Sequence, residues 1–319
     1  MALKRAVLVG IDEYDQYPQL GGCVNDVKAL APLVQRHEDG APNFKTQTFT
    51  SDGFRIDRRS LLGALDKLLE PGADVALFYF AGHGAQVDSD VVLVTPDGIG
   101  GDEGVPLATV LGKVQASKVP EVIIILDCCY SGAETGVFQM RGNAIGLRSG
   151  LSMLTASRGD QQAAETADGR GMFSQLLCGA LDGGAADVLG QITLAGVYDY
   201  LTESFGAFDQ RPTFKANIDH LHVLRNCKPA VALPILRRLA EYFPDADKDF
   251  ALDPSFEWTS PIHKPENATI FGHLQRCVSA RLVEPVGAEH MYHAAMNSES
   301  CKLTALGKHY RRLAEQGDI

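Results

Sequence analysis

The sequence lacks several features that define other classes of protein. No apolar run reaches the roughly 18 residues needed to span a bilayer, and the first residues turn polar too early for a secretory signal peptide. Seven cysteines, an odd number in 319 residues, do not fit a disulfide framework. Positive charge is scarce, because the net charge is −11. We therefore expect a cytoplasmic protein with free thiols, no membrane contact and no nucleic-acid-coating surface.

The composition is that of a globular protein, with 45% hydrophobic and 22% charged residues. Three short apolar runs predict strands buried on both faces, at residues 6–9, 75–80 and 122–126. Stretches with helical apolar spacing lie between or beside them, at 24–35, 58–69 and 107–114. Alternating strands and helices predict an α/β fold, with a largely parallel sheet covered by helices on both sides.

Chemically versatile residues follow each predicted strand. The strands lead into the segments 10–12, 81–84 and 127–132. Because ligands of such sheets bind beyond the carboxyl ends of the strands, these segments mark the expected site. Farther along, we expect a long exposed glycine-rich loop at 133–150, a strand at 151–156 and helices at 173–181 and 194–204.

A change of composition near residue 225 predicts a domain boundary. Six prolines punctuate residues 226–266, which also hold the single tryptophan, Trp258, and are interpreted as a connector. Residues 267–319 are expected to form a small winged-helix-like α+β module, with a helix at 268–282, strands at 282–286 and 291–296, and a helix at 303–315. From residue 226 onward 11 Lys and Arg face 12 Asp and Glu, so −10 of the total charge belongs to residues 1–225.

His83 and Cys129 form the candidate catalytic pair. A histidine can take the proton of a cysteine thiol and later pass it to a leaving amine. Both residues follow predicted strands, so they converge if those strands are neighbours, although 46 positions separate them. The backbone N–H groups of Gly84 and Cys129 are candidates for an oxyanion hole.

Two motifs carry a resemblance to a known family. YFAGHGAQ at 79–86 and DCCYSG at 127–132 resemble the histidine and cysteine motifs of the caspase superfamily, at a spacing close to the roughly 50 residues typical of caspases. The resemblance covers about residues 4–222. It implies a caspase-like three-layer α/β/α sandwich for a peptidase domain at 1–225. Asp127, two residues before the cysteine, is similar to the pattern of metacaspases and their prokaryotic relatives.

The metacaspase resemblance also implies a pocket for the substrate residue before the scissile bond, P1. Its residues would be Cys23, Asp26, Ala81, Asp127 and, from a loop at 155–161, Asp160. Two carboxylates facing one slot bind a guanidinium or ammonium group well. We therefore expect protein substrates with Arg, and second Lys, at P1. The chain departs from the common family pattern at Ala81, often serine, and at Tyr130, often histidine.

Self-processing follows from an arginine preference. Arg141 and Arg148 lie in the glycine-rich loop just after the nucleophile, and exposed loops are where proteolysis concentrates. We expect cleavage at one of them.

Calcium is the open alternative to an enzyme that needs no cofactor. Many metacaspases require calcium, and acidic residues occur in roughly corresponding regions, at Asp97, Asp102, Glu103 and Glu134. No carboxylate ladder of the EF-hand kind is present, and acidic surface loops are commonly just solvated.

Plainer interpretations stand beside these roles. Cys128 and Cys23 can be packing residues, Asp26 a helix N-cap and Asp127 a carboxylate satisfied by backbone amides. Two pairs of histidines suggest zinc: His220 with His222, and His290 with His293. No Cys-x-x-Cys pair accompanies them, so ordinary histidines are the plainer interpretation. Three cations of the last helix suggest DNA binding or a solvated face, at Lys308, Arg311 and Arg312.

The leading hypothesis is a cysteine endopeptidase. The resemblance implies a monomer in a prokaryotic stress, cell-death or anti-phage proteolytic pathway, with an upstream activating protease or signalling partner. The alternatives are a catalytically silent caspase-like scaffold and a DNA-binding regulator, each working through the C-terminal module. Intact His83 and Cys129 favour the enzyme.

Overall fold

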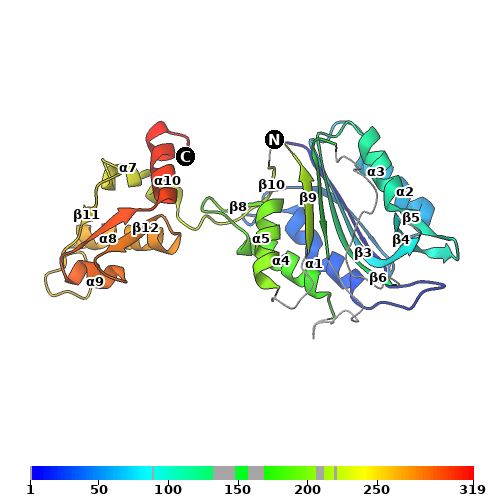
Figure 1. Cartoon of the computed structure of the whole chain (residues 1–319), viewed down its shortest axis with the longest axis horizontal. Coiled ribbons are helices and arrows are strands. Elements are labelled where there is room, and N and C mark those ends of the chain that lie inside the picture. Colours follow the sequence, from blue (N-terminus) through cyan, green and yellow to red (C-terminus); the bar gives the residue numbers. More distant parts are fainter. Residues whose placement is uncertain (1, 88–89, 132–147, 157–168, 206–211, 219–220) are drawn as a thin grey trace. The chain divides into compact units, whose positions relative to one another are not determined.

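A mixed sheet with mostly parallel strands organises the N-terminal part of the chain (Figure 1). The computed structural model describes residues 2–87, 90–131, 148–156, 169–205, 212–218 and 221–319, with only the backbone of 129–131. Within these residues the sheet has eight strands, in the order β2-β1-β3-β6-β7-β9, with β4 paired to β3 and β5 paired to β4. The strands are β1 (Lys4–Gly10), β2 (Lys45–Thr50), β3 (Val75–Val87), β4 (Asp90–Ile99), β5 (Asp102–Pro106), β6 (Glu121–Ser131), β7 (Leu151–Thr155) and β9 (Thr213–Asn217).

Helices cover both faces of this sheet, as the sequence predicts. Even-numbered apolar residues of β3 and β6, such as Phe78 and Ile124, pack towards α2 (Arg58–Leu68) and α3 (Leu107–Ala116). Odd-numbered residues, such as Leu77 and Ile125, pack towards α1 (Cys23–Gln35), α4 (Met172–Gly179) and α5 (Leu194–Ser204). The two separate cores confirm the three-layer α/β/α fold.

The local sequence explains where the helices lie. The inward face of α1 buries Val24, Val27, Leu30 and Val34 at helical spacing. Helix α2 begins at Asp57, whose carboxylate accepts a hydrogen bond from the Ser60 backbone N–H at 2.7 Å. A short π-helical turn, η1 (Ala180–Gly184), continues α4, and β8 (Gln191–Thr193) pairs with β10 (Val223–Asn226) beside it.

Strands β3 and β6 are longer than the apolar runs that predict them. The run at 75–80 continues as strand to Val87, because Gly84–Val87 pair with β4 in an antiparallel hairpin. The run at 122–126 continues as strand to Ser131, because its end pairs in parallel with the extended part of β3. The described residues of both candidate motifs, 79–86 and 127–131, therefore lie within strands rather than in turns after them.

The C-terminal part of the chain is a second compact unit, made of residues 228–319 with 187–190. Its elements are α6 (Leu233–Arg237), α7 (Leu239–Tyr242), β11 (Phe250–Ala251), α8 (Pro265–Ser279), β12 (Val283–Val286), α9 (Met291–Met296), β13 (Ser300–Leu303) and α10 (Ala305–Gln316). The strands form one antiparallel sheet in the order β11-β13-β12.

Three details of this unit differ from the sequence prediction. Residues 291–296 form helix α9 instead of a strand, because the buried residues Met291, Ala294 and Ala295 follow a helical spacing. The partner of β12 is β13, so the winged-helix-like arrangement is not confirmed. The segment 226–266 is also more than a connector, since Val231, Leu236 and Phe243 lie in the core of this unit.

Candidate active site

The pairing of β3 with β6 brings the two sequence motifs together. The strands run parallel in a register that places His83 beside Cys129, Ala81 beside Asp127, and Gly84 beside Tyr130. Adjacent strands lie about 4.8 Å apart, and residues paired in register belong to the same face of a sheet. Residues 46 positions apart in sequence are thus neighbours at the carboxyl edge of the sheet, where the strand order predicts a site.

The ring of His83 is buried and fixed by the loop that follows β1. His83 Nε2 lies 2.8 Å from the backbone oxygen of Pro18. Because a carbonyl oxygen only accepts hydrogen bonds, Nε2 carries the hydrogen, and in the neutral ring Nδ1 is the nitrogen able to take up a proton. Tyr14 and Tyr17 pack on the same ring, with centroids 4.7 and 5.7 Å away. Sequence reasoning missed these three partners.

Tyr14 connects this loop to the backbone of β3. Its hydroxyl accepts a hydrogen bond of 2.8 Å from the His83 backbone N–H. A Cβ atom at position 82 would lie 2.5 Å from the same hydroxyl, so glycine is required at Gly82 for this approach. The sequence alone gives little indication of this role for Tyr14, because a lone tyrosine in a loop has no characteristic spacing.

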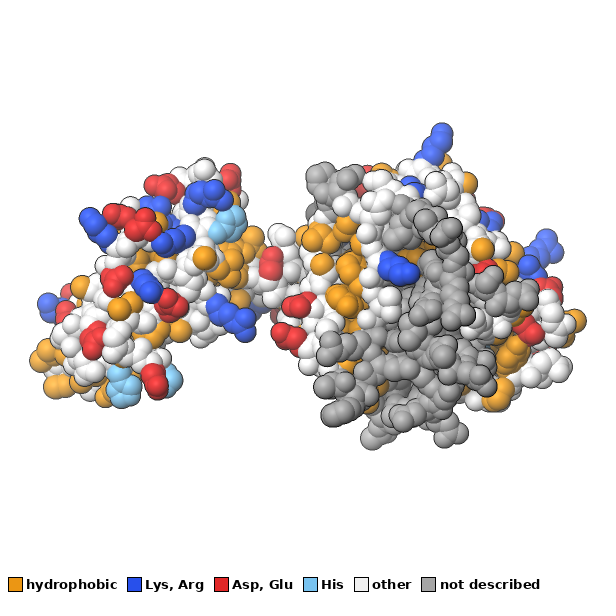
Figure 2. All heavy atoms as spheres, in the orientation of Figure 1, with side chains coloured by type: hydrophobic (Ala, Val, Ile, Leu, Met, Phe, Trp, Pro, Cys, Tyr) orange, Lys and Arg blue, Asp and Glu red, His pale blue; other side chains and the backbone are white. Residues whose placement is uncertain are grey.

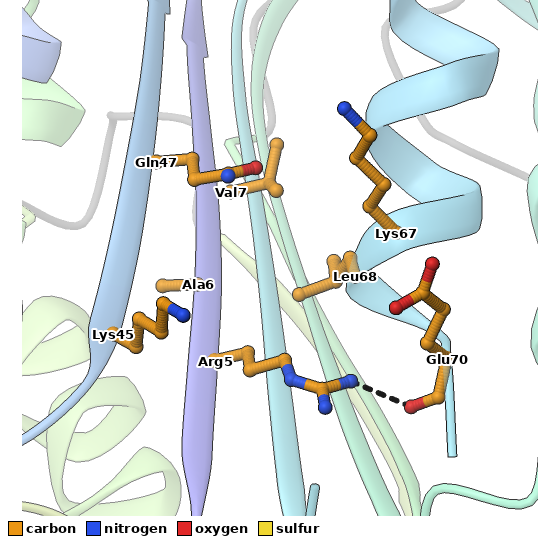
Figure 3. Close-up of a pocket in the computed structure, with 8 residues that line it drawn as sticks. All are labelled: Arg5, Ala6, Val7, Lys45, Gln47, Lys67, Leu68 and Glu70. Carbon is orange, nitrogen blue, oxygen red and sulfur yellow. Dashed lines mark hydrogen bonds between the residues drawn. The ribbon is translucent and has the colours of Figure 1, made fainter. Parts of the chain in front are cut away.

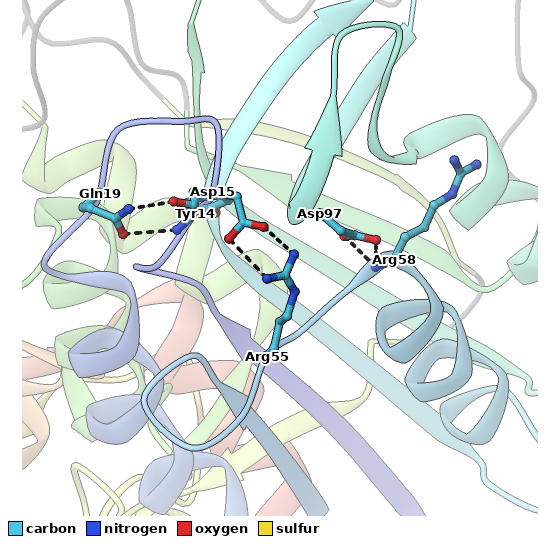
Figure 4. Close-up of polar contacts among 6 residues, drawn as sticks. All are labelled: Tyr14, Asp15, Gln19, Arg55, Arg58 and Asp97. Atoms are coloured by element: carbon cyan, nitrogen blue, oxygen red, sulfur yellow. Dashed lines mark hydrogen bonds and ion pairs between the residues drawn. The ribbon is translucent and has the colours of Figure 1, made fainter.

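Polar contacts hold the loop itself (Figure 4). The Tyr14 backbone exchanges two hydrogen bonds with the Gln19 side chain, of 3.1 and 2.7 Å. Asp15 forms a two-point ion pair with Arg55, from the segment between β2 and α2. Tyr17 donates a hydrogen bond to Glu103 in β5. The loop that orients His83 is thus tied to two other parts of the chain, the segment before α2 and strand β5.

A buried acidic cluster lies next to the histidine and cysteine strands. Asp26 and Asp127 are only 2% and 3% exposed. Burial raises the pKa of the Cys23 thiol well above its usual value, and the carboxylates of Asp12, Asp127 and Asp26 raise it further. Tyr79 donates a 3.4 Å hydrogen bond to Asp127. The carboxylates of Asp12, Asp26 and Asp127 therefore all act on the Cys23 thiol at this edge.

The position of Asp26 is set by the start of α1. Asp12 accepts hydrogen bonds from the backbone N–H groups of Cys23, at 2.8 Å, and Val24, at 3.2 Å. The helix begins at Cys23, and Asp26 lies in its first turn, accepting a 3.1 Å bond from the Gly171 backbone N–H. The N-cap interpretation of Asp26 is therefore wrong, because Asp12 binds these backbone groups instead. Asp12 is a further residue that sequence reasoning missed.

The remaining predicted site residues fall in three places. Ala81 is buried beside Asp127, and Gly84 is also paired with Leu93 of β4. Cys128 is fully buried on the opposite face, in the core with α2 and α3, which agrees with a packing role. Arg148 is half-buried and donates a 2.6 Å hydrogen bond to the Val119 carbonyl. The others, Glu134, Arg141 and Asp160, lie outside the described residues.

The described carboxylates named for calcium have protein partners. Asp97 accepts hydrogen bonds from the backbone N–H of Arg58 at the start of α2 (Figure 4). Asp102 pairs with the Arg58 guanidinium, and Glu103 with Tyr17. Among described residues no three His, Cys, Asp or Glu side chains are grouped as a metal site. Asp97, Asp102 and Glu103 thus each have a partner within the protein, and calcium dependence stays a prediction.

The histidines and the last helix also have ordinary contacts. His222 lies 3.1 Å from a Glu121 oxygen, whereas His290 and His293 pack with ring centroids 6.3 Å apart; His220 lies outside the described residues. Arg311 is buried and donates to the carbonyls of Phe243 and Pro244, and its neighbours Lys308 and Arg312 contact Asp247 and His309. On the visible face of the C-terminal unit, acidic and basic side chains are interspersed (Figure 2).

Comparison with known proteins decides the family. Residues 3–221 match the Caspase domain, Peptidase C14. The chain belongs to the caspase-domain family. This family of cysteine-type peptidases is the one that the two motifs resemble. Within the described residues of this caspase-domain chain, no helix is long and apolar enough to cross a membrane.

Metacaspases are among the similar curated proteins. The chain is 30% identical to metacaspase-1 of Plasmodium falciparum (isolate 3D7) over 149 residues, 41% of this chain and 24% of that protein. It is 29% identical to metacaspase-6 of Arabidopsis thaliana over 153 residues, 40% of this chain and 38% of that protein. It is 30% identical to metacaspase-2 of Trypanosoma brucei brucei (strain 927/4 GUTat10.1) over 148 residues, which are 40% of this chain and 42% of that protein. The matches span less than half of each relative.

Solved structures show the same fold. Caspase-1 from Spodoptera frugiperda superposes with a TM-score of 0.50 at 16% identity, over 71% of this chain and 91% of that one. Protein GSU0716 from Geobacter sulfurreducens superposes with a TM-score of 0.51, also at 16% identity, over 71% of this chain and 98% of that one. The caspase-like sandwich expected from the motifs is therefore confirmed.

Proposed function

We propose that this caspase-domain chain is a cysteine endopeptidase in which Cys129 is the nucleophile and His83 the general acid and base. The single observation that carries the proposal is the register of β3 and β6, which pairs the two residues at the carboxyl edge of the sheet. The family match covers both strands. A strand register cannot slip by one residue without moving every side chain to the other face, so the pairing is strongly specified.

The chemistry follows from the state of the His83 ring. Nε2–H is held by the Pro18 carbonyl, so Nδ1 takes the thiol proton of Cys129. The thiolate then attacks the scissile carbonyl carbon, and the tetrahedral intermediate collapses with proton transfer from His83 to the leaving amine. Water, deprotonated by His83, hydrolyses the resulting thioester and restores the thiol. The backbone N–H groups of Gly84 and Cys129 are the proposed oxyanion donors.

A basic P1 residue is the proposed specificity, with Arg preferred to Lys. Asp26 and Asp127, together with Cys23 and Ala81, lie at the same edge as the catalytic pair, and Asp160 is proposed as a further wall. Two carboxylates at one edge favour a cationic side chain, and a guanidinium can bridge both through its planar fork.

A fluorogenic peptide ending in Arg tests the proposal. We expect the wild-type chain to cleave it, and the Cys129→Ala and His83→Ala variants to lose activity by about three orders of magnitude or more. The matched control is Cys128→Ala, which removes the neighbouring buried thiol and is expected to reduce stability rather than turnover. Equal activity of Cys129→Ala and wild type would exclude the proposed nucleophile.

We further propose that the chain processes itself and acts in a proteolytic pathway of stress, cell death or phage defence in a prokaryote. The arginine preference supports self-processing, since Arg141 and Arg148 follow the nucleophile in sequence. The prokaryotic setting remains a prediction, because the metacaspase relatives above are eukaryotic. Upstream activators, a monomeric state and a cytoplasmic location are likewise predictions.

A further inference from the structure

A cavity lies at the amino end of the sheet, at the opposite end of β1 from the candidate active site. It is a trough of about 300 Å³ between the edge strand β2 and the end of α2 (Figure 3). Lys45 and Gln47 approach it from β2, Arg5 from β1, and Lys67 and Glu70 from the helix side.

The trough concentrates positive charge in an acidic domain. Its walls bring Arg5, Lys45 and Lys67 together with one carboxylate, Glu70. Among the described residues, none of these three cations is within ion-pair distance of a carboxylate, whereas other lysines of this domain pair with aspartates, as Lys28 does with Asp52. Since residues 1–225 carry a net charge of −10, three cations along one trough, without an ion-pair partner among the described residues, are a local exception. They create a positive potential that attracts an anion.

Backbone geometry fixes the positions of the donors. The register of β1 and β2 pairs Arg5 with Lys45 and Val7 with Gln47, so all four residues share the face that α2 partly covers. Arg5 donates to the carbonyls of Glu70, at 2.7 Å, and Pro71, at 3.3 Å. These contacts hold the guanidinium in place and offset the negative end of the helix dipole, which would otherwise repel an anion.

The lining indicates the chemical class of the ligand. The polar side chains of the wall are nitrogen donors apart from Glu70 and the amide oxygen of Gln47, and no aromatic ring lines the trough on which a nucleobase could stack. The volume exceeds that of a single water, about 30 Å³, roughly tenfold. We propose that this trough binds a small phosphorylated metabolite with two linked phosphate groups, held by Arg5, Lys45 and Lys67.

Calorimetric titration of the full chain with inorganic pyrophosphate tests the proposal. We expect binding to wild type and a loss of affinity of about tenfold or more in Lys45→Gln/Lys67→Gln, because charge-assisted contacts to phosphate are lost. The matched control, Lys118→Gln/Lys264→Gln, makes the same charge change at exposed lysines elsewhere and is expected to bind as wild type does. Weaker binding of orthophosphate than of pyrophosphate to the wild-type chain would indicate that the trough recognises two linked phosphate groups.

A variant in the opposite direction guards against misfolding. Glu70→Gln removes the one acidic side chain of the wall and is expected to tighten pyrophosphate binding several-fold. Absence of binding to wild type at millimolar pyrophosphate, equal binding to the Lys45→Gln/Lys67→Gln variant, or weaker binding to Glu70→Gln would each overturn the proposal. Thermal melts of every variant show whether the fold is retained.

Discussion

Single side chains at the sheet's edge define how the proposed catalytic pair can react. His83 is held at its backbone by Tyr14 and at its ring by Pro18. These contacts orient the imidazole before any substrate arrives. The reaction therefore does not need the free energy that reorienting the ring would cost. Asp26 is positioned in a similar way, because Asp12 anchors the helix end that carries it.

At this scale the first prediction concerns P1 recognition. Asp127→Asn is expected to lower kcat/KM for an Arg substrate by about tenfold to a hundredfold, since a hydrogen bond to a charged group contributes about 1.5–3 kcal/mol. The measurement compares paired substrates with Arg or its neutral isostere citrulline at P1. The ratio of the two kcat/KM values should fall in the variant.

The control for that prediction is Asp66→Asn, because Asp66 pairs with Lys113 at an exposed site away from the edge. It should leave the Arg-to-citrulline ratio unchanged. If Asp127→Asn lowers kcat/KM equally for the Arg and citrulline substrates, Asp127 has a structural role and the acidic pocket does not recognise the charge of the P1 residue.

A second prediction concerns Glu121, whose side chain is 7% exposed. Burial raises its pKa from 4.5 to about 7, with Lys4 acting in the opposite direction. The folded chain then binds this proton more tightly than the unfolded chain, so the free energy of unfolding falls as the pH rises from about 4.5 to 7. Glu121→Gln should therefore be more stable than wild type above about pH 7, by about 1–3 kcal/mol.

Urea unfolding at about pH 5 and about pH 8 measures this effect. Glu203→Gln, an exposed change on α5, supplies the control and should follow the wild-type pH dependence. A Glu121→Gln variant that loses stability with pH as steeply as wild type would show that another group causes the dependence.

At the scale of elements, the long strands β3 and β6 matter most. The hairpin with β4 extends β3 past the last apolar residue of its core, and β6 follows it in register. As a result His83 and Cys129 lie on a hydrogen-bonded scaffold rather than in a loop. Sites built on strands hold their geometry better than sites built on loops.

The loop after β6 carries the prediction of self-cleavage. Arg148, near its end, is held by the Val119 carbonyl and is half-buried, so a protease must first release it. We therefore expect cleavage after Arg141. Intact-mass spectrometry of purified chains should show processing in wild type and Arg148→Ala, and none within 133–150 in Arg141→Ala. Processing that persists there in Arg141→Ala/Arg148→Ala would refute the arginine assignment.

For the whole molecule, two compact units of unequal size follow one another in the chain. The caspase-domain match lies in the first unit. The second unit has a core of its own, which includes Phe271, Leu274 and Leu303. The proposed catalytic residues therefore lie in the first unit, residues 1–186 and 191–227.

Metal removal is a prediction at this scale. Asp97, Asp102 and Glu103 are engaged by Arg58 and Tyr17, so peptidase activity of the full chain should be unchanged by EGTA or by added calcium. Activity is measured with the Arg substrate after dialysis against chelator. Activation by calcium that disappears in Asp102→Asn would contradict this expectation and identify a site that forms on rearrangement.

The candidate site was predictable in part. His83, Cys129, Asp26 and Asp127 stand in motifs that a single sequence reveals. The partners Tyr14 and Pro18 were not predictable, because their contacts depend on how one loop folds over the end of β3. Strand β2, KTQTFT, was also missed, since an edge strand needs no continuous apolar run.

By itself, the sequence determined the fold class and the candidate catalytic pair, because apolar periodicity and local motifs are properties of neighbouring positions. Only the tertiary structure decided that residues 83 and 129 are register partners, that Asp12 rather than Asp26 binds the start of α1, and that residues 291–296 are helical. Those outcomes depend on pairing and burial between distant segments, whose free energies no local pattern encodes.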